Sequence, residues 1–113
     1  MRHWDRTRQD GPLTVQVEHT GDALTVRAIG DLTRSTSQMF EAELRLVISA
    51  DASTVDLDLG DVGFIDSTGL RSVVRIGSQS LRAGGRLRMR HAPAPVQQAI
   101  QSGGFERLLP LAD

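Results

Sequence analysis

The stretch TVDLDLGDVGFIDSTGL, residues 54–70, decides the fold because it contains a strand followed at once by the start of a helix. Over residues 54–59 apolar and acidic side chains alternate, which is the period of a half-buried strand. Phe64 and Ile65 continue the apolar pattern and are predicted to point toward the core. Asp66 and Ser67 are residue types that cap helix N-termini, so a helix is predicted to begin near Ser67.

The segments on either side of this stretch continue the succession of strands and helices. Residues 13–17 and 23–29 each show strand patterning around a Thr-Gly-Asp turn, which predicts a hairpin. The other predicted elements are a helix from about residue 35 or 36 to 48, a helix from 67 to Ala83-Gly84-Gly85, a strand over 86–91, a helix over 93–102, and a last turn or edge strand over 105–111. Residues 1–11 are charged and unpatterned, so a flexible tail is predicted there and a single folded domain over 12–113.

This order predicts an α/β domain with a mixed four- or five-stranded sheet and helices packed mainly on one face. Strands that are joined by a helix run parallel, with right-handed crossovers. In the helix that begins at Ser67, Ile76 falls off the predicted buried stripe and is expected to be exposed. The stripe itself consists of Leu70, Val73, Val74, Gly77 and Leu81. On the uncovered sheet face, acidic and basic side chains are expected to pair across strands, namely Asp56 and Asp58 with Arg86, Arg88 and Arg90.

The composition excludes several kinds of chemistry. The 113 residues contain no cysteine and no lysine, which rules out disulfides, thiolate nucleophiles and Schiff bases. The three histidines lack ligand spacing and Ser67 lacks a Gly-x-Ser-x-Gly elbow, so no metal, cofactor or enzymatic activity is predicted. No apolar run approaches the roughly 20 residues of a membrane span, and no signal-peptide pattern is present. We therefore expect a soluble, cytoplasmic protein with no membrane partner.

The charge is divided unevenly along the chain, although the formal net charge is only −1. Residues 1–66 contain twelve acidic residues and six arginines, whereas residues 67–113 contain two acidic residues and seven arginines. No global field attracts nucleic acid, so nucleic acid is not expected as a direct partner. The asymmetry favours two elements that neutralise each other when packed, and a polar surface for a partner is the alternative.

Gly69 and Ser67 each allow a structural and a functional interpretation. Asp66 or Ser67 before a helix is ordinarily a cap. Gly69 is harder to explain by local structure alone, because glycine within a helix lowers the stability by about 1 kcal/mol relative to alanine. Its missing Cβ permits another backbone to approach closely. That backbone belongs either to a partner protein or to the chain's own turn over residues 30–34, and the sequence supports both equally.

The run Leu57-Asp58-Leu59, then Val62 and residues 64–70 (FIDSTGL), resembles the signature of STAS domains, and most of all that of bacterial anti-sigma factor antagonists. Gly30-Asp31-Leu32 and the order of elements agree, so the resemblance extends over residues 13–111. It implies a regulator of sigma-factor-dependent transcription that binds an anti-sigma factor, often a serine kinase. The kinase phosphorylates the serine of the Asp-Ser pair, here Ser67, a phosphatase reverses this, and only the unphosphorylated form binds productively.

By the same resemblance, the partner-binding surface around Ser67 comprises Asp31, Thr33, Asp66, Thr68, Gly69 and Leu70. Arg71 is added from its place on an exposed face of the same helix, where contact with an acidic partner and a merely solvated exterior are the alternatives and the second is favoured. Thr33 departs from the family, whose members often have an acidic residue there, and this bears on phosphorylation more than on binding. Two other functions remain open. One is a STAS scaffold or transporter-associated subunit that is never phosphorylated, and the other is a small nucleotide- or anion-binding domain that uses the open helix N-terminus.

Overall fold

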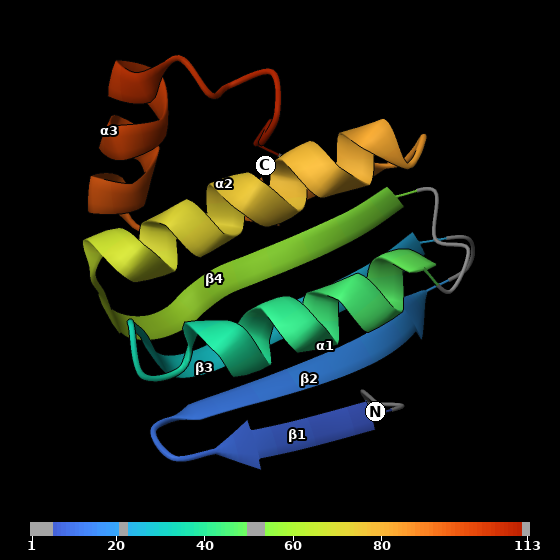
Figure 1. Cartoon of the computed structure of the whole chain (residues 1–113), viewed down its shortest axis with the longest axis vertical. Coiled ribbons are helices and arrows are strands. Elements are labelled where there is room, and N and C mark those ends of the chain that lie inside the picture. Colours follow the sequence, from blue (N-terminus) through green and yellow to red (C-terminus); the bar gives the residue numbers. More distant parts are fainter. Residues whose placement is uncertain (1–5, 21–22, 50–53, 112–113) are drawn as a thin grey trace.

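The computed structural model describes residues 6–20, 23–49 and 54–111, which form one α/β domain (Figure 1). Its elements in chain order are β1 (Arg6–Asp10), β2 (Leu13–Thr20), β3 (Ala23–Leu32), α1 (Ser37–Ser49), β4 (Thr54–Ile65), α2 (Ser67–Arg82), β5 (Arg86–Arg90) and α3 (Ala94–Gly103). The predicted helices and strands over residues 13–103 are therefore confirmed, with boundaries that differ by a few residues.

The strands form one mixed sheet in the order β1-β2-β3-β4-β5. The first three strands are antiparallel neighbours, whereas β3, β4 and β5 run parallel. α1 and α2 lie side by side on one face, and α3 lies beyond α2, near its N-terminal end (Figure 1). The buried apolar side chains of the sheet and the helices form a single core. The predicted α/β architecture is thus confirmed.

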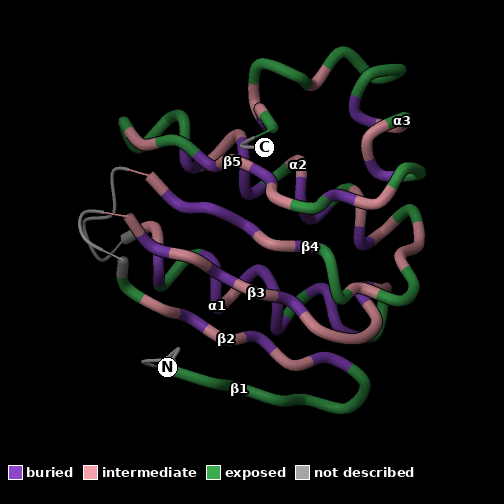
Figure 2. The backbone as a smooth tube through the Cα atoms, turned by 180° about the vertical axis from the view of Figure 1, so that it is seen from behind, coloured by how far each residue is buried: buried purple, intermediate pink, exposed green. Residues whose placement is uncertain are grey.

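The first eleven residues are not all a tail. Residues 6–10 form the edge strand β1, which pairs with β2 and is exposed along its whole length (Figure 2). This strand contains no apolar residue, so it has no hydrophobic period by which the sequence could reveal it. Arg6 and Arg8 instead bind the carboxylate of Glu43 on α1, which is 2% exposed. Residues 1–5 lie outside the described residues.

The far end of β4 departs from regular alternation. The pairing of β4 with β3 shifts twice, between Arg27 and Ile29 and again between Gly30 and Asp31. Each shift inserts an extra residue in β4, so the two reversals of side-chain direction cancel, and Ile65 pairs with the buried Leu32 while Phe64 pairs with Asp31. Adjacent strand residues point to opposite faces, so Phe64 and Ile65 cannot both face the core; the prediction that Phe64 points inward is wrong, and its side chain is 58% exposed.

The buried arc of α2 is wider than its sequence indicates. Ile76 is completely buried, so the prediction that it is exposed is wrong. α2 rests on the sheet, contacts α1 along one side, and meets Leu109 of the C-terminal segment at Gly77. Leu81 is 44% exposed although it was predicted to be buried, because it lies in the last turn of the helix, beside a surface hollow that Leu108 also lines.

Ion pairs join the two oppositely charged parts of the chain. On the sheet face that carries no described helix, Arg88 and Arg90 both bind the carboxylate of Asp56, which is 4% exposed. Between the helices, Glu41 of α1 accepts hydrogen bonds from the hydroxyl of Ser72 and the guanidinium of Arg75 on α2. Packing of oppositely charged elements, the favoured explanation of the charge asymmetry, is confirmed.

Candidate functional site

The start of α2 is held by the side chain of the residue before it. Asp66 has extended backbone angles, and its Oδ1 accepts a hydrogen bond from the Gly69 amide at 2.8 Å. Its carbonyl oxygen accepts the Leu70 amide at 2.9 Å, the first bond of the helical ladder. Asp66 is therefore the N-cap, and Ser67 is the first residue of the helix.

The same carboxylate also binds the loop between β3 and α1. Its Oδ2 accepts the backbone amide of Arg34 at 3.0 Å, and the Asp66 amide donates to the carbonyl of Leu32 at 3.3 Å. The hydrogen bonds from Gly69 and Arg34 stabilise the charged carboxylate and lower the pKa of Asp66 below its ordinary value. Asp66 consequently stays negatively charged at neutral pH and joins α2 to the loop.

Gly69 provides the space for this junction. A Cβ at residue 69 would lie 2.0 Å from the carbonyl oxygen of Leu32 and 2.7 Å from its carbonyl carbon. Gly69 is buried, so the backbone that fills the space beside it belongs to this chain and not to a partner. Of the two interpretations of this glycine, the structure supports close packing against the end of β3.

Ser67 lies on the surface at the rim of a hollow. Its side chain is exposed, and its hydroxyl takes part in no hydrogen bond among the residues that the structure describes. The hollow has a volume of about 210 Å³ and is bounded by the start of α2 and the first turn of α3. Its lining includes Leu70 from α2 and Pro95 and Val96 from α3, so the serine hydroxyl adjoins an apolar depression that is open to solvent.

The other predicted site residues fall into two groups. Thr68, Leu70 and Arg71 lie with Ser67 on the first turns of α2, where Thr68 and Leu70 are half-buried and Arg71 is exposed. The second group is Asp31, which is half-buried and pairs in register with Phe64 at the end of β4. Asp31 directly precedes Leu32, whose carbonyl accepts the Asp66 amide.

Thr33 is used inside the chain. Its carbonyl accepts the Ser37 amide at 2.8 Å, and its hydroxyl accepts the Ser35 amide at 3.3 Å, at the turn that precedes α1. Thr33 therefore shapes the loop that meets Asp66, and its side chain is neutral.

Sequence reasoning missed two residues of this surface, Arg34 and Phe64. Arg34 contacts Asp66 through its backbone amide, which no side-chain pattern reveals. For Phe64 a signal was present, because the alternation of Val55, Leu57 and Leu59 places Ile65 on the core side of β4 and Phe64 on the opposite side.

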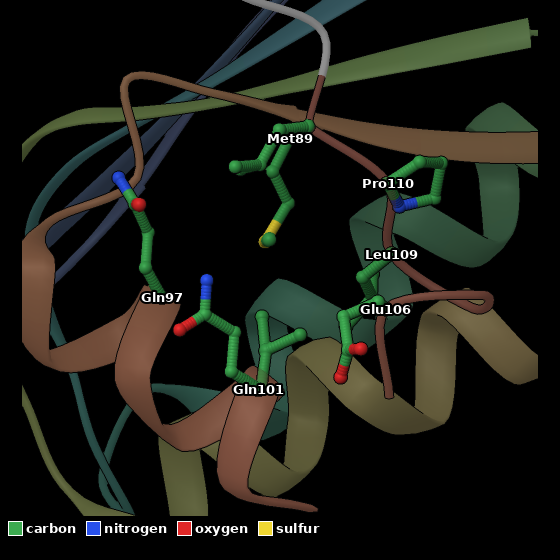
Figure 3. A pocket seen from close by; sticks show the side chains of 8 residues that line it. Met89, Gln97, Gln101, Glu106, Leu109 and Pro110 are labelled. Carbon is green, nitrogen blue, oxygen red and sulfur yellow. The ribbon is translucent and has the colours of Figure 1, made fainter. Parts of the chain in front are cut away.

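Two further hollows lie apart from the serine. One, of about 310 Å³, runs along α2 between Leu70, Val74 and Phe105 and is flanked by Arg71 and Arg75. The other, of about 260 Å³, lies between α3 and the C-terminal segment, with Met89 and Leu109 in its lining. Figure 3 shows the amide groups of two α3 glutamines around it, with Glu106 opposite.

The described part of the chain has neither a metal-binding cluster nor a membrane-spanning helix. Within residues 6–20, 23–49 and 54–111, no group of three or more histidine, aspartate or glutamate side chains is arranged to hold a metal ion. No helix in the same ranges is long and apolar enough to cross a membrane.

Two curated bacterial proteins are similar to this chain in sequence. BtrV of Bordetella bronchiseptica, a candidate anti-sigma factor antagonist, is 29% identical over 84 residues, which cover 74% of this chain and 72% of that protein. The anti-sigma F factor antagonist of Paenibacillus polymyxa is 26% identical over 102 residues, or 89% of this chain and 87% of that protein. The chain thus resembles these proteins over most of their length.

Solved structures show the same fold. An anti-sigma factor antagonist from Mycobacterium paratuberculosis superposes with a TM-score of 0.75 at 20% identity, covering 88% of this chain and 84% of that one. The phosphorylated form of SpoIIAA from Bacillus gives a TM-score of 0.70 at 20% identity, over 88% and 91% of the two chains. The family model described as "Mlab, STAS domain" matches residues 15–110. That match runs from β2 to the end of the C-terminal turns, and the chain therefore belongs to the STAS domain family.

Proposed function

We propose that this chain is an anti-sigma factor antagonist whose binding to its partner is switched off by phosphorylation of Ser67. The observation that carries the proposal is the exposed Ser67 hydroxyl, next to a fixed Asp66 carboxylate and at the rim of an apolar hollow. The names of the similar Bordetella and Paenibacillus proteins support the antagonist role. The partner is accordingly an anti-sigma factor that is itself a serine kinase, with a phosphatase that restores the serine.

The switch acts on the interface and leaves the fold intact. Phosphorylation adds about −1.5 to −2 charges at neutral pH. Ser67 is exposed, so the added group requires no rearrangement of the core, and a negative charge at a helix N-terminus is favourable. With Asp66 adjacent and Asp31 on the neighbouring strand, the phosphate makes this surface strongly negative. Like charges across an interface cost several kcal/mol, which corresponds to orders of magnitude in affinity.

The unphosphorylated surface is suited to a protein partner. Phe64 is exposed, and Leu70 lies between two hollows along α2. Exposed aromatic and aliphatic side chains beside hollows are typical anchors of protein interfaces. The alternative of a free small anion at the open helix N-terminus has less support, because the Gly69 amide is already bound to the Asp66 carboxylate.

Affinity capture with variants of Ser67 tests the proposal. Tagged wild type, Ser67→Ala and Ser67→Asp are used to capture proteins from the bacterium that encodes the chain, with quantification by mass spectrometry. Ser102→Asp, an exposed site near the C-terminal end of α3, is the matched charge control. We expect an anti-sigma factor on wild type, Ser67→Ala and Ser102→Asp, and at least a tenfold loss on Ser67→Asp. Equal recovery of that factor on Ser67→Ala and Ser67→Asp would contradict the proposal.

A STAS scaffold that is never phosphorylated is the second candidate function. It is favoured by Thr33, whose hydroxyl accepts an amide of its own loop and which has no charge to engage a kinase. Incubation with the captured kinase and ATP separates the two functions. One phosphate, located on Ser67 by mass spectrometry, supports the switch, and absence of the modification supports the scaffold.

A further inference from the structure

Two arginines on either side of Ser67 have no acidic partner. Arg34, in the loop before α1, and Arg71, on α2, are both exposed. In the described ranges neither forms an ion pair, whereas seven other arginines bind carboxylates: Arg6, Arg8, Arg27, Arg45, Arg75, Arg88 and Arg90. Arg82, Arg86 and Arg107 also form no ion pair among the described residues, but of these five arginines Arg34 and Arg71 are the two placed next to the candidate phosphorylation site by sequence and by the Arg34–Asp66 hydrogen bond.

Both arginines lie within reach of the Ser67 side chain. The Arg34 amide donates to the Asp66 carboxylate at 3.0 Å, so the side chain of Arg34 starts beside the residue that precedes Ser67. Arg71 follows Ser67 by four residues in α2, which places the two side chains on the same face of the helix, one turn apart. The two arginine side chains therefore start near the serine from different elements, the loop before α1 and α2.

We propose that Arg34 and Arg71 form a binding site for the phosphate carried by Ser67, an inference that rests on the proposed phosphorylation of this serine. The guanidinium group donates paired hydrogen bonds to phosphate oxygens, and such charge-assisted bonds are among the strongest in proteins. The Gly69 amide is already bound to Asp66, so the phosphate must obtain its donors elsewhere. The two unpaired arginines supply them.

This arrangement adds a second effect to the switch. In the unphosphorylated protein both guanidinium groups are free to bind carboxylates of a partner. After phosphorylation they bind the phosphate within the same chain, and the partner meets a surface from which two cations have been withdrawn. The surface of the unphosphorylated protein is therefore expected to select an acidic partner.

Two acidic groups among the described residues also lie at this junction. Asp66 and Asp31 are the nearby acidic groups, on the cap of α2 and at the end of β3. The residues of α3 that line the hollow beside Ser67 are Pro95 and Val96, neither of which is charged. The ionisation of the phosphate therefore reports mainly on the balance between these two acids and the two arginines.

Titration of the phosphate tests the site without any kinase or partner. The full chain is produced with phosphoserine incorporated genetically at residue 67, and ³¹P NMR follows the phosphate signal against pH. Arg34→Gln and Arg71→Gln are compared with wild type, alone and together, and Arg82→Gln, an exposed arginine at the far end of α2, is the matched control. Circular dichroism verifies that each variant is folded.

Removing a nearby cation makes the dianion harder to form, so each substitution is expected to raise the titration midpoint by about half a pH unit, and the pair by about one. Arg82→Gln should leave the midpoint unchanged. A double variant that titrates like the wild type would overturn the proposal. Because this measurement needs no partner, its outcome is separate from that of the capture experiment with Ser67→Asp.

Discussion

Replacement of Gly69 by alanine tests the contact that joins α2 to the loop before α1. The new Cβ would lie 2.0 Å from the carbonyl oxygen of Leu32 and 2.7 Å from its carbonyl carbon. Both are backbone atoms, so no change of rotamer relieves the overlap. Overpacking costs up to about 3 kcal/mol, whereas alanine gains about 1 kcal/mol in helix propensity over glycine. We therefore expect Gly69→Ala to lower the free energy of unfolding by about 2 kcal/mol.

Urea and thermal unfolding followed by circular dichroism measure this effect. For a chain of 113 residues, about 2 kcal/mol corresponds to a decrease in Tm of about 8 °C. Gly63→Ala is the matched control, because a Cβ at residue 63 meets no heavy atom within 4 Å, and its Tm should be unchanged. If Gly69→Ala is as stable as the wild type, or more stable as helix propensity alone predicts, the close contact with Leu32 is refuted.

Three further substitutions test other contacts. Asp66→Ala removes the cap of α2 and should lower Tm. Hydrogen bonds lower the pKa of Asp66 in the folded state, so the stabilisation by its carboxylate is present above the ordinary pKa of 3.8 and is lost as pH falls through the lower folded pKa. Thermal scans should therefore show a smaller difference in Tm between wild type and Asp66→Ala at acid pH. Asp56→Ala leaves two β5 arginines without their carboxylate and should cost about 1–2 kcal/mol in urea unfolding, since both are partly exposed. The resemblance to anti-sigma factor antagonists implies an acidic residue at position 33, so Thr33→Asp should increase the initial rate of Ser67 phosphorylation, measured by mass spectrometry. An unchanged rate would remove Thr33 as a determinant.

Much of the fold could be predicted because its signals are local. The alternation of Val55, Leu57 and Leu59 and the cap at Asp66 located the start of β4 and the start of α2 within a residue or two, although β4 continues six residues beyond the predicted end at Leu59. The edge strand β1 could not be predicted, because it is held by backbone pairing and by Glu43, a residue on α1 that is distant in sequence. Long-range partners of this kind leave no period in the strand itself.

The candidate site shows the same division between local and long-range signals. Ser67 and Asp66 could be assigned from their place before a helix. The burial of Ile76 depends on how α2 is surrounded by the rest of the domain, whereas the exposure of Phe64 follows from the alternation of side chains along β4. The role of Gly69 was undecided until the position of Leu32 was known.

The most direct test of the proposed switch is isothermal titration calorimetry with the captured anti-sigma factor. The unmodified chain and the chain with phosphoserine at residue 67 are titrated under identical conditions. Repulsion of several kcal/mol predicts that the phosphorylated chain binds at least about 100-fold more weakly. Equal dissociation constants for the two forms would contradict the regulation of this protein through Ser67.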